Sequence, residues 1–151
     1  MMEKKKERSL KEIYLESNKR NPFVLHNGIE IEDVFPDRSI LRLTIRPESL
    51  NLHGLVHGGA LFTLADNAAG CAASTDGRVY VTQQSDIHFL RVQSEGVLRA
   101  EARVRHRGRS TVLVDVNITG EEGRLMATAC FTYFCMDGSQ TARSIRAARQ
   151  P

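Results

Sequence analysis

The sequence has no lysine beyond residue 19, and from residue 20 onward every cation other than histidine is arginine. A Schiff-base amine or a phosphate-binding P-loop needs a lysine within the folded domain, so both chemistries are excluded. Cysteine is also scarce. Cys71, Cys130 and Cys135 form no C-x-x-C pair, so we predict neither a disulfide framework nor a zinc cluster. A cysteine nucleophile stays open, although no neighbouring histidine supports it.

Long apolar runs are missing too. No stretch approaches the roughly 18 apolar residues of a membrane-spanning helix, and the charged first residues lack the apolar segment of a secretion signal. The 151 residues, 41% of them apolar, suit one domain with a real core. We therefore expect a single-domain, cytoplasmic protein that does not enter a membrane.

The net charge of +3 is unevenly distributed. Residues 1–20 carry seven cations and four anions, and residues 137–151 carry three cations and one anion, which leaves −2 for the middle of the chain. Nucleic-acid binding needs a broad basic face that displaces counterions from phosphates. The charge pattern therefore argues against a nucleic-acid partner.

Hydrophobic periodicity predicts an α+β fold in the order β-β-α-β-β-β-β. A short helix over residues 9–20 precedes it and ends at Asn21-Pro22. The expected strands are 29–35, 40–46, 79–92, 96–107, 110–119 and 124–136, and the expected buried helix is 57–74. We expect consecutive strands after the helix to be antiparallel neighbours, and both faces of 124–136 to be covered. Residues 1–27 would form an N-terminal extension, 28–136 the domain and 137–151 a flexible tail.

Asp66 is the anomaly of the buried helix, because it lies among Leu64, Ala65, Ala68 and Ala69. A buried, unpaired carboxylate is costly, and such an acid is a candidate for acid–base or nucleophilic chemistry. The alternative is that Asp66 points to solvent or is neutralised by an arginine.

The entry to this helix is the second candidate site. Gly58 and Gly59 allow a ligand to approach the free N–H groups of the first turn, which suits a polarised carbonyl. They could equally form only a sharp turn. His53 and His57 are four residues apart, but no third ligand accompanies them, so we expect no metal. A serine-hydrolase G-x-S-x-G motif is absent from the sequence.

A cationic turn follows strand 96–107. Its residues 105–110, R-H-R-G-R-S, suit phosphate recognition through planar guanidinium groups, or form a solvated strand end.

The motif N-x-x-G-x-x-H-G-G over residues 51–59, followed by L-A-D at 64–66, resembles the hotdog-fold acyl-CoA thioesterases of the phenylacetate-pathway type. The resemblance covers about residues 28–136. It implies a long central helix wrapped by a curved antiparallel sheet, and hydrolysis of an acyl-CoA thioester to free acid and CoA. It implies no cofactor, since CoA is part of the substrate.

The resemblance also implies roles for single residues. Asp66 would be the general base or nucleophile, with Thr82 close to it. The N–H of Gly58 would polarise the thioester carbonyl, Asn51 would hold the water or the carbonyl, and His57 would line the site. The residues expected to contact CoA or the acyl group are Gly59, Phe62, Phe89, Arg107 and Arg109.

In this family the site lies between two protomers. Asn51 and Gly58 would come from one chain, and Asp66 and Thr82 from the other. We therefore expect a homodimer, and a homotetramer built from two dimers. A non-catalytic acyl-CoA sensor on the same fold is the alternative, although the extension is too short for an added helix-turn-helix. Enoyl-CoA dehydration shares the fold, but the Asp/His pairing that it resembles is not found.

Overall fold

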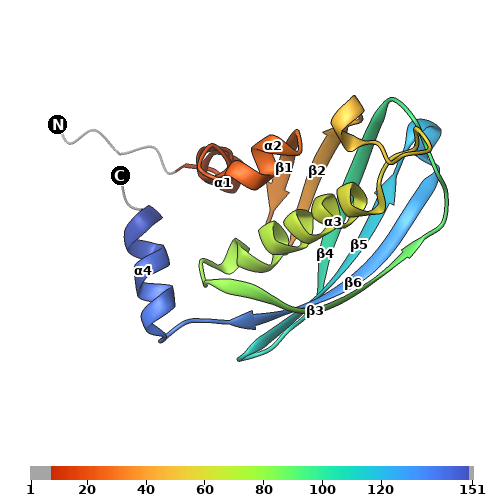
Figure 1. Ribbon diagram of the computed structural model, residues 1–151. Helices are drawn as coiled ribbons and strands as arrows, with labels where there is room; N and C mark the ends of the chain where they lie inside the picture. The colour runs from red at the N-terminus through yellow and green to blue at the C-terminus, as the bar shows by residue number, and fades with distance from the viewer. Residues whose placement is uncertain (1–7, 150–151) are drawn as a thin grey trace.

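The computed structural model describes residues 8–149 as one sheet of six strands, with a long helix, α3, packed across it (Figure 1). The helices are α1 (Leu10–Asn18), α2 (Pro22–His26), α3 (Gly58–Ala73) and α4 (Gln140–Arg149). The strands are β1 (Ile29–Phe35), β2 (Arg38–Thr44), β3 (Tyr80–Phe89), β4 (Val97–Arg107), β5 (Thr111–Thr119) and β6 (Leu125–Cys135). The predicted α+β class and the order β-β-α-β-β-β-β are confirmed.

All strand pairs are antiparallel, and the strands lie in the order β1-β2-β4-β5-β6-β3. The expectation that the strands on either side of residues 90–96 are neighbours is wrong, because β3 pairs with β6 at the edge of the sheet. This connection is longer than a hairpin loop of about two to five residues, so it can cross between strands that do not touch. The backbone N–H groups of Leu90 and Arg91 donate to the carbonyl of Met126 at 2.8 and 3.1 Å, which fixes the crossing.

Small side chains bring α3 close to the sheet. The buried residues of this helix are Ala60, Leu61, Leu64, Ala65, Ala68, Ala69, Ala72 and Ala73. The hydroxyl of Ser39 on β2 donates to the carbonyl of Ala68 at 2.7 Å and ties the helix to the sheet. The inward residues of β6 are buried against α3, but its outward residues Thr128, Cys130 and Thr132 are half-buried. The second face of β6 is therefore less covered than we expected.

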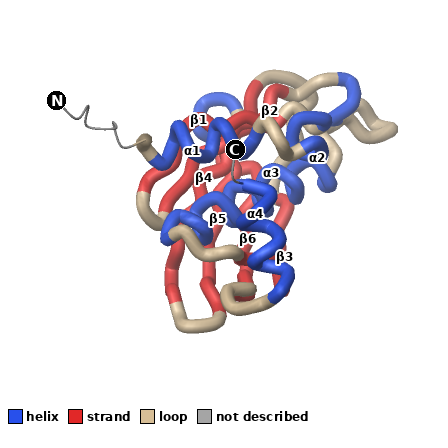
Figure 2. The backbone as a smooth tube through the Cα atoms, turned by 90° about the vertical axis from the view of Figure 1, so that its left-hand side faces the viewer, coloured by secondary structure: helices blue, strands red, loops and turns tan. Residues whose placement is uncertain are grey.

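The two ends of the chain contain more helix than the sequence suggested. The helix predicted over residues 9–20 is α1, and it ends before Asn21-Pro22 as expected. Pro22 then starts a second helix, α2, where proline is favoured because the first N–H of a helix needs no partner. The N-cap Asn21 accepts a bond from the N–H of Val24. Helices α1 and α2 lie beside β1 (Figures 1 and 2). The segment expected as a flexible tail forms α4 over most of its length, and residues 150–151 lie outside the described part of the chain.

Within residues 8–149, no helix has the length and apolar character needed to cross a membrane.

Candidate active site

Asp66 lies in the middle of α3, half-buried, and its carboxylate is held by two hydroxyl groups. Its Oδ1 accepts from Thr82 Oγ1 on β3 at 2.8 Å and from the Tyr133 hydroxyl on β6 at 2.8 Å. No arginine neutralises it among the described residues, and within that part of the chain Oδ2 has no hydrogen-bond partner. The acid is therefore fixed in orientation while one oxygen stays open to a reactant.

Tyr133, which contacts the Asp66 carboxylate, is a candidate site residue that the sequence analysis missed. Its side chain is only 3% exposed, and its hydroxyl also lies 2.6 Å from the carbonyl oxygen of Asp66. Burial, and then the charge and hydrogen bond of Asp66, raise the pKa of Tyr133, so the hydroxyl keeps its proton. The alternation of inward and outward residues along β6 predicts only that the Tyr133 side chain points inward. The register that sets Tyr133 opposite Thr82 could not be read from the sequence.

The first turn of α3 leaves one backbone donor free. His57 is the N-cap, and its Nδ1 accepts from the N–H of Gly59 at 2.8 Å. The N–H groups of Ala60 and Leu61 both donate to the carbonyl of His57. Among the described residues nothing accepts from the N–H of Gly58. Gly58, and not Gly59, therefore offers the donor that an oxyanion hole requires.

Glycine at position 58 also keeps this donor accessible. A Cβ atom built there would lie 3.4 Å from the ring of Phe89, so a larger side chain would crowd that ring. Phe62, one turn further along α3, packs against Phe131 with ring centroids 5.7 Å apart and ring planes tilted by 57°. Phe62 and Phe89, the two aromatic residues expected to contact the acyl group, thus lie near the start of α3.

Asn51 lies in the loop before α3, and its side-chain oxygen orders that loop. Oδ1 accepts from the N–H groups of His53 and Leu55 at 2.9 and 3.2 Å. The amide nitrogen makes no hydrogen bond to the part of the chain that the structure describes. Asn51 therefore presents a donor, which can hold a carbonyl or a water oxygen.

One protomer does not bring all the predicted residues together. Gly58 and Asp66 are eight residues apart on one helix, so their backbones are about 12 Å apart at 1.5 Å per residue. A base and an oxyanion donor must both lie about 3 Å from the reacting group. The chain therefore carries two half-sites, one around Asp66 with Thr82 and Tyr133, and one around Gly58.

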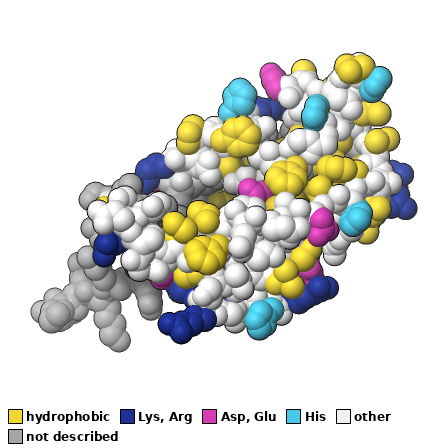
Figure 3. All heavy atoms as spheres, turned by 60° about the horizontal axis from the view of Figure 1, so that its bottom comes forward, with side chains coloured by type: hydrophobic (Ala, Val, Ile, Leu, Met, Phe, Trp, Pro, Cys, Tyr) yellow, Lys and Arg dark blue, Asp and Glu magenta, His cyan; other side chains and the backbone are white. Residues whose placement is uncertain are grey.

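The edge strand β3 runs between these half-sites and has exposed hydrophobic residues at its two ends, Val81 and Phe89. Exposed large hydrophobic residues on and around it are Leu52, Phe62, Val81, Phe89, Leu90 and Val92. Figure 3 brings this side of the molecule forward and shows hydrophobic side chains spread over it. A long edge strand with exposed apolar residues is a site for pairing with another strand.

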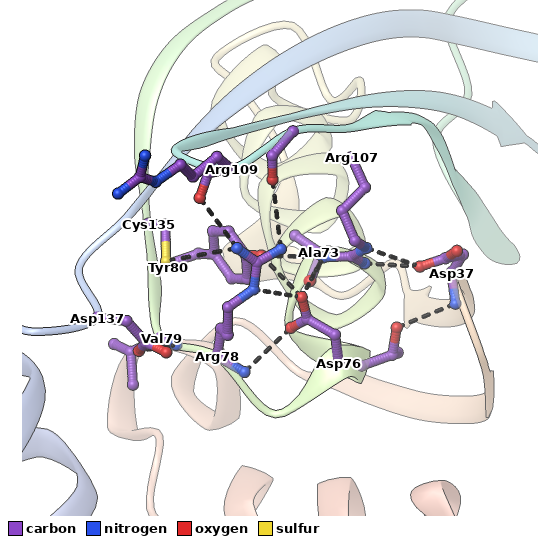
Figure 4. A network of polar contacts seen from close by, with 12 residues as sticks. Asp37, Ala73, Asp76, Arg78, Val79, Tyr80, Arg107, Arg109, Cys135 and Asp137 are labelled. Atoms are coloured by element: carbon purple, nitrogen blue, oxygen red, sulfur yellow. Dashed lines mark hydrogen bonds and ion pairs between the residues drawn. The ribbon is translucent and has the colours of Figure 1, made fainter.

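Arg107, one of the two predicted CoA contacts, is held inside a polar network at the end of α3 (Figure 4). Its Nη1 donates to the carbonyl of Ala73 and to Asp76 Oδ2, each at 2.8 Å, and to the Tyr80 hydroxyl at 3.0 Å. Its Nη2 donates to Asp37 Oδ1 at 2.6 Å. This guanidinium therefore caps α3 and has little capacity left for a phosphate.

Arg109, the other predicted CoA contact, is exposed, and its guanidinium points away from that network (Figure 4). Only its backbone carbonyl takes part, accepting from Arg78 Nη1 at 3.0 Å. The turn thus separates two arginines that the sequence could not distinguish, one structural and one exposed.

The network also perturbs two neighbouring acids. Burial alone would raise the pKa of Asp76, but hydrogen bonds from Arg78 and Tyr80 and the charge of Arg107 lower it below its usual value. Burial, followed by the hydrogen bond to Asp76, raises the pKa of Tyr80 to about 12. The network is therefore a set of fixed charges and donors at neutral pH.

In the part of the chain that the structure describes, Asp66 belongs to no metal-binding cluster, and the Cys130 thiol is not activated. Within residues 8–149, no group of three or more His, Cys, Asp or Glu side chains could hold a metal ion. Burial first, and then the charge of Asp115, raises the pKa of Cys130, which keeps this thiol protonated.

Comparison with known proteins gives matches over most of the chain. Residues 53–127 match the family model described as Thioesterase superfamily. The acyl-coenzyme A thioesterase PaaI of Escherichia coli is 35% identical over 101 residues, which cover 66% of this chain and 72% of that protein.

Two solved structures are also similar. A hypothetical thioesterase protein with coenzyme A from Streptococcus pneumoniae has a TM-score of 0.72 and 35% identity, covering 78% of this chain and 94% of that one. The PaaI protein of Escherichia coli has a TM-score of 0.78 and 27% identity, covering 87% and 99%. The resemblance drawn from residues 51–66 is confirmed. His57, Gly58, Asp66 and Thr82 lie in the segment matched by the family model, and Tyr133 follows it.

Proposed function

Because the chain belongs to the thioesterase superfamily and is a thioester hydrolase of the hotdog fold, we propose that it hydrolyses an acyl-CoA at a site shared by two protomers. The observation that carries this proposal is the Asp66 carboxylate, held by Thr82 and Tyr133 with one oxygen open. The names of two relatives support the substrate. One is called an acyl-coenzyme A thioesterase and the other is described with coenzyme A.

In the proposed site the thioester carbonyl oxygen accepts from the N–H of Gly58, and the Asn51 amide holds the carbonyl or the water. Asp66 then acts from the second protomer by one of two routes. Its Oδ2 removes a proton from a water that attacks the carbonyl carbon, or attacks that carbon itself and forms an anhydride that water cleaves. In both routes the C–S bond breaks, and the CoA thiolate leaves and takes up a proton.

The remaining predicted residues take supporting roles in this proposal. His57 uses Nδ1 to cap α3, so its Nε2 carries the proton and can donate into the site. Phe62 and Phe89 cover the region next to Gly58, and Gly59 allows the close approach. Arg109 would contact the CoA phosphates, while Arg107 would hold the turn in place.

The homodimer is part of the proposal because a single chain separates its half-sites by about 12 Å. Pairing of β3 with a second β3 would remove the exposed sheet edge and cover the apolar residues around it. Two such dimers would give the homotetramer expected from the resemblance. None of the three half-buried cysteines forms a disulfide within the described residues, which fits a reducing compartment, so we propose the cytoplasm as the place of action.

The test is a panel of acyl-CoA esters assayed by release of free CoA thiol, with Asp66→Asn as the matched variant. We expect the wild type to release thiol and Asp66→Asn to lose about 10²–10⁴-fold in kcat while its circular dichroism spectrum is retained. Unchanged turnover by a folded Asp66→Asn protein would contradict the role of Asp66 in the proposed mechanism. Tight binding of CoA esters by the wild type, with no hydrolysis of any of them, would favour the sensor instead.

A further inference from the structure

The edge strand β3 turns the same face toward α3 at both of its ends. Near its start, the Thr82 hydroxyl donates to the Asp66 carboxylate on α3. At its end, the ring of Phe89 lies 3.4 Å from the position of a Cβ atom on Gly58 of α3. Thr82 and Phe89 are seven positions apart, and residues of a regular strand alternate between two faces, so a regular strand would separate them. The strand therefore contains one residue that breaks the alternation.

That residue is Gln83. In the pairing of β3 with β6, Thr82 lies opposite Tyr133. The next paired residue is Gln84, opposite Thr132, so the register skips Gln83. Such a β-bulge sets two residues of one strand against one residue of the neighbouring strand, and bulges are frequent next to active sites. Because of the bulge, residues on either side of it can both point toward α3.

The outer edge of β3 can meet a second β3 in few registers. A symmetric antiparallel pair has a two-fold axis between its strands, and residues directly opposite each other share a face of the sheet. An axis between two consecutive residues would set an inward side chain opposite an outward one. The axis must therefore pass a residue that lies opposite its own copy, and near the middle of β3 these residues are Ser85, Asp86 and Ile87.

The register with Asp86 on the axis completes the site. Gln84 then lies opposite His88 of the second copy. Because the bulge skips one residue, the next pair is Thr82 with Phe89 of the second copy. Thr82 holds the carboxylate of one chain, and Phe89 lies beside the N–H donor of the other chain. Neighbouring strands are about 4.8 Å apart, so the two half-sites meet on one side of a continuous sheet.

The neighbouring registers separate the half-sites. With Ser85 on the axis, Thr82 would lie opposite Ile87 of the second copy. With Ile87 on the axis, Thr82 would lie opposite Arg91, beyond the end of β3. In either register the carboxylate would be displaced by two residues, about 7 Å along the strand, from the donor that it must meet.

We propose that two chains pair through β3 with Asp86 on the two-fold axis, so that Asp66 of each chain meets Gly58 of the other. The inference rests on the proposed function, because it assumes that both half-sites act on one carbonyl. It adds the residues that meet across the interface, and it makes the bulge at Gln83 the feature that lets one interface serve both sites.

This register brings two like charges together on the outer face of the sheet. Asp86 borders an outer cavity of about 270 Å³, whose other titratable side chains are His88, Arg105, Asp115 and Cys130. Arg105 pairs with Asp115 at 2.8 Å, and His88 Nε2 lies 3.8 Å from Asp86 Oδ1. On the axis two Asp86 carboxylates would face each other, and like charges directly opposite destabilise a pair of strands. The dimer should therefore contain one repulsive contact at its centre.

Single cysteines on the outer face of β3 distinguish the three registers. Gln84, Asp86 and His88 are exposed, so each can be replaced by cysteine without disturbing the core. The background is Cys130→Ser, because Cys130 lies opposite Asp86 on β6 and could form a disulfide within one chain. The variants are oxidised alone and in pairwise mixtures of chains, and disulfide-linked dimers are counted on non-reducing gels.

We expect Asp86→Cys to cross-link to its own copy, and Gln84→Cys to cross-link only to His88→Cys. A disulfide needs Cα atoms about 4.4–6.8 Å apart, which directly opposite residues satisfy and diagonal ones do not. Cross-links of Asp86→Cys with Gln84→Cys would place the axis at Ser85, and cross-links with His88→Cys would place it at Ile87. Either result, or no cross-link in any mixture, would overturn the proposal.

The same variants separate this proposal from the proposed function. A displaced axis in proteins that still hydrolyse acyl-CoA would overturn the register and leave thioester hydrolysis intact. A cross-link at Asp86 in a protein that hydrolyses no acyl-CoA would support the register and overturn the function.

Charge reversal on the axis gives a second measurement. Asp86→Lys chains and wild-type chains of different mass are allowed to exchange, and the dimers are counted by native mass spectrometry. Since mixed dimers replace a repulsive contact by an attractive one, we expect them to exceed the statistical half, and to return toward half in about 1 M salt. Glu30→Lys makes the same change on β1, at the opposite edge of the sheet, and should give half. Asp86→Lys mixtures that also stay at half would overturn the axis.

Discussion

The two oxygens of the Asp66 carboxylate have different environments. Oδ1 accepts from Thr82 and Tyr133, whereas Oδ2 is open. A carboxylate held at one oxygen cannot rotate freely, so its other oxygen is presented in a fixed direction. In the proposed mechanism, Thr82 and Tyr133 are therefore positioning residues, which would act on the reaction through the orientation of Asp66.

Removal of either hydroxyl should lower the turnover rate more than it weakens binding. A hydrogen bond to a charged group contributes about 1.5–3 kcal/mol, so we expect Tyr133→Phe and Thr82→Val each to lower kcat about tenfold or more, with KM little changed. Thr82→Ser keeps the hydroxyl and should restore the wild-type kcat. Steady-state kinetics and melting temperatures check this. A rise in KM at unchanged kcat would assign these hydroxyls to substrate binding instead.

At the scale of the element, α3 has different functions along its length. Its first turn offers the Gly58 donor, its middle carries Asp66, and its last carbonyls are capped by Arg107. Cationic groups stabilise the negative end of a helix dipole, and Arg107 is well placed to do so because its side chain is only 20% exposed. The cap holds the helix at the angle at which Asp66 meets β3 and β6.

The two arginines of the cationic turn should respond differently to truncation. Arg107→Ala leaves Asp37 and Asp76 without their shared cation, and we expect it to lower the free energy of unfolding by about 3 kcal/mol. Arg109→Ala should leave stability within about 0.5 kcal/mol and raise KM for CoA esters. Urea denaturation and kinetics on the pair check both. An unstable Arg109→Ala protein would contradict the division of roles.

The same network predicts how stability depends on pH. The folded protein lowers the pKa of Asp76 below its usual 3.8, so the unfolded chain binds its proton first as the pH falls. The contribution of the Asp76 carboxylate to the free energy of unfolding is therefore complete above about pH 5. It is lost as the pH falls through the lowered pKa of Asp76.

Asp76→Asn removes this dependence. The wild type should exceed the variant by about 1–3 kcal/mol in free energy of unfolding between about pH 5 and 7, and the difference should shrink below about pH 4. Denaturant titrations at each pH measure it. A difference that grows on acidification would contradict the assigned pKa direction.

Local pattern was enough to locate the strands and the central helix, and the motif at residues 51–66 was enough to find Asp66 and Gly58. The local pattern could not predict that β3 lies beside β6. Alternation of apolar and polar residues shows which face of the sheet a residue occupies but not which strand lies next to it. For the same reason Tyr133 was missed. Arg107 and Arg109 looked alike in the sequence, since the partner Asp37 lies 70 residues away from Arg107.

At the scale of the whole molecule, the proposed function depends on how two chains would meet. The half-site around Asp66 and the half-site around Gly58 lie on one helix but too far apart to act on one carbonyl. The exposed edge of β3, with Val81 and Phe89 on it, is the surface through which a second chain would complete both. A symmetric dimer would then contain two identical sites, each using residues of both protomers.

The most direct test of this account is complementation between two inactive variants. Asp66→Asn and Asn51→Ala chains, each with its own affinity tag, are co-expressed, and assemblies that contain both are purified through the two tags. A mixed dimer has one site with an intact Asp66 and an intact Asn51, so we expect about half the wild-type kcat from two nearly inactive parents. Mixed assemblies no more active than their parents would contradict a site shared between protomers.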